Sequence, residues 1–143
     1  MIGVFNTTYN KNLYDVALLI LRLGVGCFMM THGLQKLNLI MEPGTAQFID
    51  PIGIGESATL SLAVFSELVC SFLIIMGFAT RLAVIPLIIT MLVAVFVVHD
   101  NDAFNEKELG SLYLVIYILL LVVGSGRYSV DQLISGRKRK VNY

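Results

Sequence analysis

Long apolar runs separated by short polar stretches dominate this chain. Four runs stand out, at residues 13–37, 57–78, 82–99 and 109–124. A helix that crosses about 30 Å of hydrocarbon needs roughly 20 apolar residues at ~1.5 Å each, so every run is long enough or nearly so. These runs also lack the alternation of apolar and polar residues that marks the strands of a membrane barrel. The pattern therefore predicts four transmembrane helices.

The connections between the runs predict how the helices pair. Residues 77–81 leave room only for a tight turn, so the second and third helices should be antiparallel neighbours. A longer loop with several prolines and glycines covers residues 38–56, and a strongly acidic loop covers residues 100–108. We expect an all-α, polytopic membrane protein, an antiparallel four-transmembrane-helix bundle that forms one domain over residues 1–143 and ends in a basic tail at 125–143.

Composition supports lipid as the environment. The chain is 57% hydrophobic and 14% charged, which is well outside the balance of soluble domains, and its net charge of zero does not favour nucleic acid as a partner. Cys27 and Cys70 lie inside apolar runs with no C-x-x-C or zinc-type spacing, so we expect no metal site. Helix rise places them ~21 Å and ~10 Å from the cytoplasmic ends of their helices, too far apart for a disulfide. We expect inert core thiols.

The basic residues predict the orientation of the bundle. If four helices alternate in direction, Lys11, Arg81, Arg127 and the cluster at residues 137–140 share one side, and only two lysines fall on the other. Basic residues collect on the cytoplasmic side of membrane proteins. We therefore expect a multi-pass protein of the bacterial plasma (inner) membrane with both termini in the cytoplasm.

Arg22 and Glu67 are predicted to lie at bilayer depth, where a charge costs roughly 2.5 kcal/mol or more. Both lie ~14 to 15 Å from the cytoplasmic ends of their helices, so we expect them to meet. One interpretation is a buried ion pair that orders the first two helices, since one partner alone would leave an uncompensated charge. The alternative is a polar centre that binds a ligand headgroup or relays protons.

Helical periodicity places small and polar residues of the first helix on one face that should point into the bundle. This stripe consists of Arg22, Gly26, Met29, Gly33 and Lys36, with His32 on its flank. Gly24 and Cys27 point elsewhere. We expect Gly26 and Gly33 to allow close approach of a neighbouring helix, as small residues do in membranes.

The outer helix ends carry the candidate ligand-binding residues. His32 and Lys36 lie one turn apart and present an imidazole and an ammonium to the same volume. His99 ends the third helix on the same side, so two histidines can ligate haem, but they equally suit interfacial imidazoles and we do not expect haem. Tyr113 and Tyr117 are i, i+4 neighbours on the fourth helix, suited to packing or to the wall of an aromatic-ligand site.

Three segments together resemble the DoxX family of small membrane proteins, and the resemblance covers nearly the whole chain. They are Leu21 to Gly26 leading to His32 to Leu37, Glu67–Leu68 followed by Gly77 to Leu82, and Gly124 to Asp131. The family pattern maps onto Arg22, His32, Gly33, Lys36, Glu67, Gly124, Gly126, Arg127, Tyr128 and Ser129, and Arg81 in the second segment is a further candidate structural residue. Because the family takes its name from membrane subunits of a thiosulfate:quinone oxidoreductase, the resemblance implies a redox-linked membrane protein.

Two kinds of function fit these features. The first is the membrane subunit of a quinone-linked or thiol/sulfur redox system, with His32 and Lys36 polarising a quinone carbonyl and electrons supplied by a protein partner or a substrate at the outer loops. The second is a non-catalytic scaffold or adaptor that binds a protein partner or a second copy of the chain through the loop at residues 38–56. A small-molecule or lipid binder, or a transporter, is a further alternative.

Overall fold

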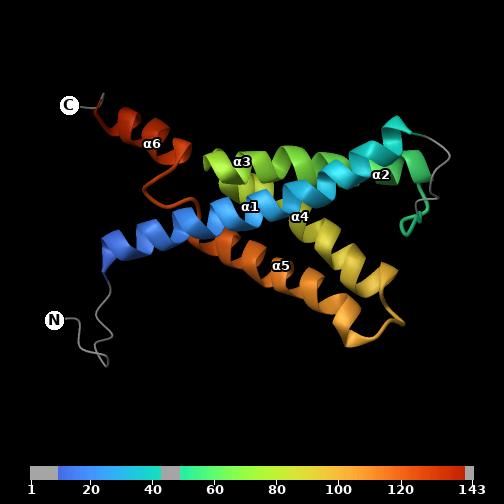
Figure 1. The fold of residues 1–143 in the computed structure, drawn as a ribbon. Helices are drawn as coiled ribbons and strands as arrows, with labels where there is room; N and C mark the ends of the chain where they lie inside the picture. Colours follow the sequence, from blue (N-terminus) through green and yellow to red (C-terminus); the bar gives the residue numbers. More distant parts are fainter. Residues whose placement is uncertain (1–9, 43–48, 141–143) are drawn as a thin grey trace.

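The computed structural model describes residues 10–42 and 49–140, without the side chains of residues 137–140. These residues fold into helices that run back and forth along one axis (Figure 1). In chain order the elements are α1 (Lys11–Met41), α2 (Glu56–Val64), the π-helical η1 (Phe65–Cys70), α3 (Ser71–Met76), α4 (Thr80–Val93), the π-helical η2 (Ala94–Val98), α5 (Phe104–Val123) and α6 (Val130–Lys140). The predicted all-α class is confirmed.

Consecutive helical segments join into longer continuous helices, which we call rods. Three rods are long and apolar enough to cross a membrane, at Lys11–Met41, Glu56–Met76 and Thr80–Val98. The second rod is α2, η1 and α3 in continuity, and the third is α4 with η2. The fourth predicted span, α5, begins earlier than expected and carries three charged residues in its first two turns. Its apolar part is therefore shorter than that of the other three.

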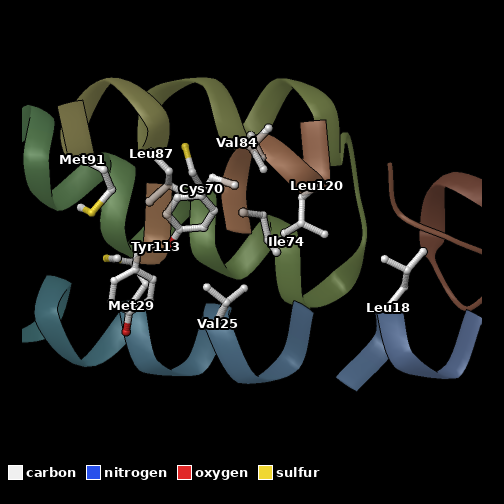
Figure 2. Packing of buried hydrophobic residues seen from close by; sticks show 12 residues of the cluster. Leu18, Val25, Met29, Cys70, Ile74, Val84, Leu87, Met91, Tyr113 and Leu120 are labelled. Carbon is white, nitrogen blue, oxygen red and sulfur yellow. The ribbon is translucent and has the colours of Figure 1, made fainter. Parts of the chain in front are cut away.

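The buried face of α1 follows the predicted stripe. Arg22, Gly26, Met29 and Gly33 are buried, whereas Cys27 is exposed and nothing lies within 4 Å of a Cβ built at Gly24. The core forms where this face meets α3, α4 and α5, as Figure 2 shows for side chains on these helices. The members of this core are Leu18, Val25, Met29, Cys70, Ile74, Ala83, Val84, Leu87, Met91, Tyr113, Tyr117 and Leu120.

Glycines on α1 let the second rod approach closely, as predicted. A Cβ at Gly26 would lie 2.5 Å from Ile75 Cγ1 and 3.1 Å from the carbonyl oxygen of Ser71. A Cβ at Gly33 would lie 2.8 Å from Leu68 Cγ and 3.0 Å from the carbonyl carbon of Glu67. These contacts set the register of the two rods, with Gly33 level with η1 and Gly26 level with α3.

The turn between α3 and α4 uses two residues with positive φ. Gly77 ends α3 at φ 67°, and Ala79, at φ 47°, precedes α4. The amides of Gly77 and Phe78 donate to the carbonyls of Ile74 (3.0 Å) and Leu73 (2.9 Å). These two hydrogen bonds, with glycine in the left-handed region, form a Schellman motif that ends α3 and directs the chain into α4. The predicted antiparallel pairing of the second and third helices is therefore confirmed.

The loop before α2 is organised by one carboxylate. Asp50 accepts hydrogen bonds from the amides of Gly53 (3.0 Å) and Gly55 (2.6 Å) and from the Thr59 hydroxyl (2.7 Å). The Thr59 hydroxyl, followed by these amides, holds the pKa of Asp50 below its usual range. The rest of the longer loop, residues 43–48, lies outside the described residues.

The predicted basic tail contains a helix that we did not predict. α6 begins directly after Ser129, whose hydroxyl accepts from the Gln132 amide (3.2 Å), and Asp131 lies in its first turn. A serine before an acidic first turn is a helix-start signal, since the hydroxyl accepts from a free amide and a negative charge is favourable at a helix N-terminus. α6 projects from the bundle near the start of α1 (Figure 1).

Candidate functional site

A small pocket lies between α1, η1, η2 and α5, near the end of the bundle where α5 begins. Its volume is about 180 Å³. Toward this end the α4–α5 pair diverges from α1 and α2 (Figure 1). The lining residues are Met29, His32, Lys36, Glu67, Met91, Ala94, Val95, His99, Glu106, Leu109, Gly110 and Tyr113. Four of the predicted site residues meet here, namely His32, Lys36, Glu67 and Tyr113.

An ion pair between Lys36 and Glu67 forms the polar side of the pocket. The Lys36 ammonium donates to Oε1 of Glu67. The Glu67 side chain is 1% exposed and that of Lys36 is 28% exposed, so the carboxylate depends on the lysine for its compensation. Oε2 of Glu67 is buried without a hydrogen-bond partner among the described residues. This oxygen can therefore accept a hydrogen bond from a ligand.

Aromatic rings form the opposite side. His32 meets Tyr113 edge to face, with ring centroids 6.2 Å apart and planes at 88°. Tyr113 stacks on Tyr117 at 6.0 Å and 18°. Tyr117 is fully buried and does not line the pocket, so it supports Tyr113 from behind. Figure 2 shows Tyr113 beside Met29 and Met91, which are soft, adaptable pocket residues.

Both π-helical segments border this pocket. η1 carries Glu67, and η2 carries Ala94 and Val95. Close packing of α5 against η2 is possible because residue 110 is glycine, where a Cβ would lie 2.9 Å from Val95 Cγ2. Short π-helical turns inside α-helices are often found at functional sites, and here two neighbouring rods carry them at one pocket.

The two histidines also lie at the same end, but they differ in their partners. His99 Nδ1 lies 2.7 Å from Oδ2 of Asp102 in the loop after η2. His99 therefore contacts its own loop as an interfacial imidazole does, whereas His32 packs on Tyr113. Among the described residues, no group of three or more His, Cys, Asp or Glu side chains is placed to hold a metal ion.

The predicted pair of Arg22 and Glu67 is wrong. Glu67 pairs with Lys36, and Arg22 lies at the other end of the bundle, where Nη2 donates to the carbonyl oxygen of Tyr128 at 2.5 Å. The prediction assumed that the first two helices end at the same level. Instead α1 begins well before that level, since Arg22 lies beside Gly77, the residue that ends α3, and Glu67 lies beside Gly33.

A loop between α5 and α6 closes the bundle around Arg22. The guanidinium of Arg22 fills the space beside Gly77, so that a Cβ at residue 77 would overlap Nη1 of Arg22. Arg22 is fully buried, and its Nε and Nη1 have no hydrogen-bond partner among the described residues. The Ser129 hydroxyl donates to the carbonyl oxygen of Gly126 (2.7 Å) and keeps this loop compact. Arg22 and the Gly-x-Gly-Arg-Tyr-Ser segment thus form one structural unit.

Asp131 joins this loop to the turn before α4. Its carboxylate accepts from the amides of Ala79 (2.7 Å) and Thr80 (3.1 Å), and its own amide donates to the carbonyl oxygen of Gly77 (2.9 Å). The carboxylate therefore caps the start of α4 from a distant part of the chain. Arg81 reaches the end of α5, where Nη2 donates to the carbonyl oxygen of Val122 at 3.2 Å.

The two cysteines are free, but two parts of their interpretation are wrong. Cys70 is buried, whereas Cys27 is exposed and is not a core thiol. The vertical offset we expected is also absent, because Gly26, the neighbour of Cys27, packs level with Ser71, the neighbour of Cys70. What separates the thiols is that Cys27 points away from the bundle.

Several site residues were not singled out from the sequence. Glu106 lines the pocket because α5 begins before the predicted fourth run. At the opposite end, buried Asp15 accepts a hydrogen bond from the Arg127 amide through Oδ1 (3.1 Å). Its position seven residues before Arg22, on the same helical stripe, was the available signal.

Comparison with known proteins agrees with this architecture. The model of the DoxX family matches residues 17–100. An uncharacterised protein of Haemophilus influenzae is 31% identical over 128 residues (83% of each chain). "Putative oxidoreductase CatD" of Bacillus subtilis is 30% identical over 134 residues (93% of this chain, 97% of the relative), and "Inner membrane protein YqjF" of Escherichia coli is 29% identical over 129 residues (87% and 97%). No solved structure gives a significant match. The chain belongs to the DoxX family of membrane proteins.

Proposed function

We propose that this protein is the membrane subunit of a quinone-linked or sulfur-linked redox system and that the pocket at Lys36 and Glu67 binds the quinone ring. The observation that carries the proposal is a ring-sized cavity with hydrogen-bond donors, an aromatic wall and a carboxylate oxygen that has no hydrogen-bond partner among the described residues. Its volume of about 180 Å³ is below the ~300 to 1,000 Å³ of pockets that enclose whole drug-sized ligands. A ring fits inside while a long apolar tail stays in lipid.

The polar groups suit both redox forms of a quinone. A quinone carbonyl only accepts hydrogen bonds, and the Lys36 ammonium and the His32 imidazole can donate them. A hydroquinone hydroxyl also donates, and Oε2 of Glu67 is an acceptor without a hydrogen-bond partner in the part of the chain that the structure describes. Met29 and Met91 cover the apolar part of the ring. In this proposal the protein holds the quinone, and a partner protein or a substrate at the outer loops supplies the electrons.

The relatives and the charge distribution support the cellular setting. One relative is named as a putative oxidoreductase and another as an inner membrane protein. Lys11, Arg81 and Arg127 lie at the end of the bundle opposite to Lys36 and to Lys107, which is in the first turns of α5. By the positive-inside rule, the pocket then faces the outer leaflet of the inner membrane and both termini are cytoplasmic.

The test measures quinone bound to purified variants. Wild type, His32→Ala and the control Gln35→Ala are purified gently in detergent, extracted and assayed for quinone content, then titrated with decylubiquinone and with menadione. Gln35 adjoins Lys36 but is exposed, so its removal should not affect the pocket. We expect His32→Ala to weaken binding about ten-fold, the effect of losing one hydrogen bond in a dry site, with an unchanged melting temperature.

Two results contradict the proposal. One is a wild-type protein that neither carries nor binds either quinone, and the other is equal quinone binding by wild type and His32→Ala. A scaffold function would then be favoured, and a subunit that co-purifies with both variants would identify the partner. A collapse of the melting temperature in His32→Ala would assign His32 to structure, and the pair Lys36→Met with Glu67→Leu would then carry the binding test.

A further inference from the structure

A second and larger cavity lies at the opposite end of the bundle. It has a volume of about 840 Å³ and is bounded by the starts of α1, α4 and α6 and by the loop that follows α5. Two membrane-crossing rods end at this level, since one stops at Met76 and the next begins at Thr80. The cavity therefore lies where the apolar spans meet the headgroup layer, far from the proposed quinone pocket.

Three cationic side chains surround this cavity, those of Lys11, Arg81 and Arg127. All three are exposed and lack a carboxylate in salt-bridge contact within the described part of the chain. Arg81 lies across the end of α5, because Gly124 leaves room for it: a Cβ there would be 3.4 Å from Arg81 Nε. Its guanidinium donates one hydrogen bond to the Val122 carbonyl, and its other donors have no further hydrogen-bond partner within residues 10–42 and 49–140. Arginine forks of this kind match phosphate oxygens.

Buried polar atoms on the cavity wall also lack partners. Asp15 is 6% exposed, and its Oδ2 has no hydrogen-bond partner among residues 10–42 and 49–140. Thr80 is fully buried, and its Oγ1 also has no hydrogen-bond partner among these residues. Asp131, the other acid at the cavity, already uses both oxygens on the amides of α4. Because buried polar atoms are nearly always satisfied, Asp15 calls for a donor brought by a ligand.

We propose that this cavity binds a phosphate ester that carries a free ammonium group, as in the phosphoethanolamine headgroup. Arg81, Arg127 and Lys11 take the phosphate, and Asp15 takes the ammonium. The headgroup of phosphatidylethanolamine and a soluble phosphoethanolamine ester share this chemistry, and the position of the cavity favours the lipid. The inference does not depend on the quinone proposal, since no residue lines both cavities.

The experiment offers purified, delipidated protein an equimolar mixture of phosphatidylethanolamine and phosphatidylcholine and counts retained lipids by native mass spectrometry. Phosphatidylcholine has the same phosphate, but its trimethylated nitrogen cannot donate a hydrogen bond. We expect wild type to retain phosphatidylethanolamine with about ten-fold preference, equivalent to about 1.4 kcal/mol. Asp15→Asn keeps an oxygen for the Arg127 amide while losing the charge, and its preference should fall to nearly one.

Matched variants separate the two parts of the headgroup. Arg81→Gln should reduce retention of both lipids several-fold without changing the preference between them. Asp102→Asn and Lys107→Gln, at the other end of the bundle, should behave like wild type. A soluble arm adds glycerophosphoethanolamine: if it displaces the lipid at millimolar concentration, the soluble ester is the ligand source, and if it does not, the lipid is.

The proposal is overturned if wild type retains the two lipids equally or retains neither lipid nor soluble ester. It is also overturned if Asp15→Asn keeps the full preference. Far-UV circular dichroism melting of each variant shows that it is folded. If the melting temperature of Asp15→Asn is much lower than that of wild type, Asp15→Glu is tested instead. This variant keeps the charge, and it must show the wild-type preference for phosphatidylethanolamine.

Discussion

The ion pair between Lys36 and Glu67 should be energetically coupled, and the structure gives the size and asymmetry of the effect. Lys36→Met leaves the carboxylate of Glu67, 1% exposed, without its cation. Removal of one partner from a buried pair costs about 3 to 5 kcal/mol. Glu67→Leu leaves an ammonium on a side chain that is 28% exposed and can reach toward water, so its cost should be smaller, about 1 to 2 kcal/mol.

The double variant should recover much of the loss, because no charge is stranded. We expect a coupling free energy of at least about 2 kcal/mol from the double-mutant cycle, with the free energy of unfolding measured by SDS titration in detergent micelles and followed by circular dichroism. Arg22→Met and Glu67→Leu serve as the control pair. Arg22 lies eleven residues before Gly33, the neighbour of Glu67, or ~16 Å along α1, so these two effects should add within about 0.5 kcal/mol.

The reasoning is refuted if the Lys36 and Glu67 effects simply add. Strong coupling of Arg22 with Glu67 would also refute the reasoning. Such coupling would mean that these two residues are in contact, which the register of α1 against α3 excludes.

Three further predictions follow from other parts of the fold. Gly77→Ala should lower the free energy of unfolding by more than about 2 kcal/mol, since its φ is 67° and a Cβ would displace the buried guanidinium, whereas Gly24→Ala should be neutral or slightly stabilising by chemical denaturation. In a cysteine-free background, a cysteine at Asp102 should react with an impermeant maleimide from outside, and one at Ser135 only after permeabilisation; outside labelling at Ser135 would reverse the topology. Because hydrogen bonds lower the folded pKa of Asp50 below its unfolded value, its support of the loop is complete above about pH 4 and disappears as the pH falls through that lowered pKa. Amide chemical shifts in the loop should titrate there, and Asp50→Asn should abolish the transition.

Features that depend on local patterns could be predicted from the sequence. Apolar run lengths specified helices of membrane-spanning size, and the spacing of small and polar residues on α1 identified its buried face, including Gly26 and Gly33. The glycine-containing turn at residues 77–81 specified an antiparallel pair. These features follow from helix geometry and from the cost of exposing backbone groups to lipid, which act over a few residues at a time.

Which polar residues meet could not be predicted in this way, because it depends on how the helices pack. Depth counted from helix ends paired Arg22 with Glu67, but helix ends carry no information on how far one helix slides along another. That register comes from the contacts of Gly26 and Gly33 with the second rod and from the loop that closes around Arg22. The same register brings Lys36 to Glu67, a pair that depends on residues far apart in the chain.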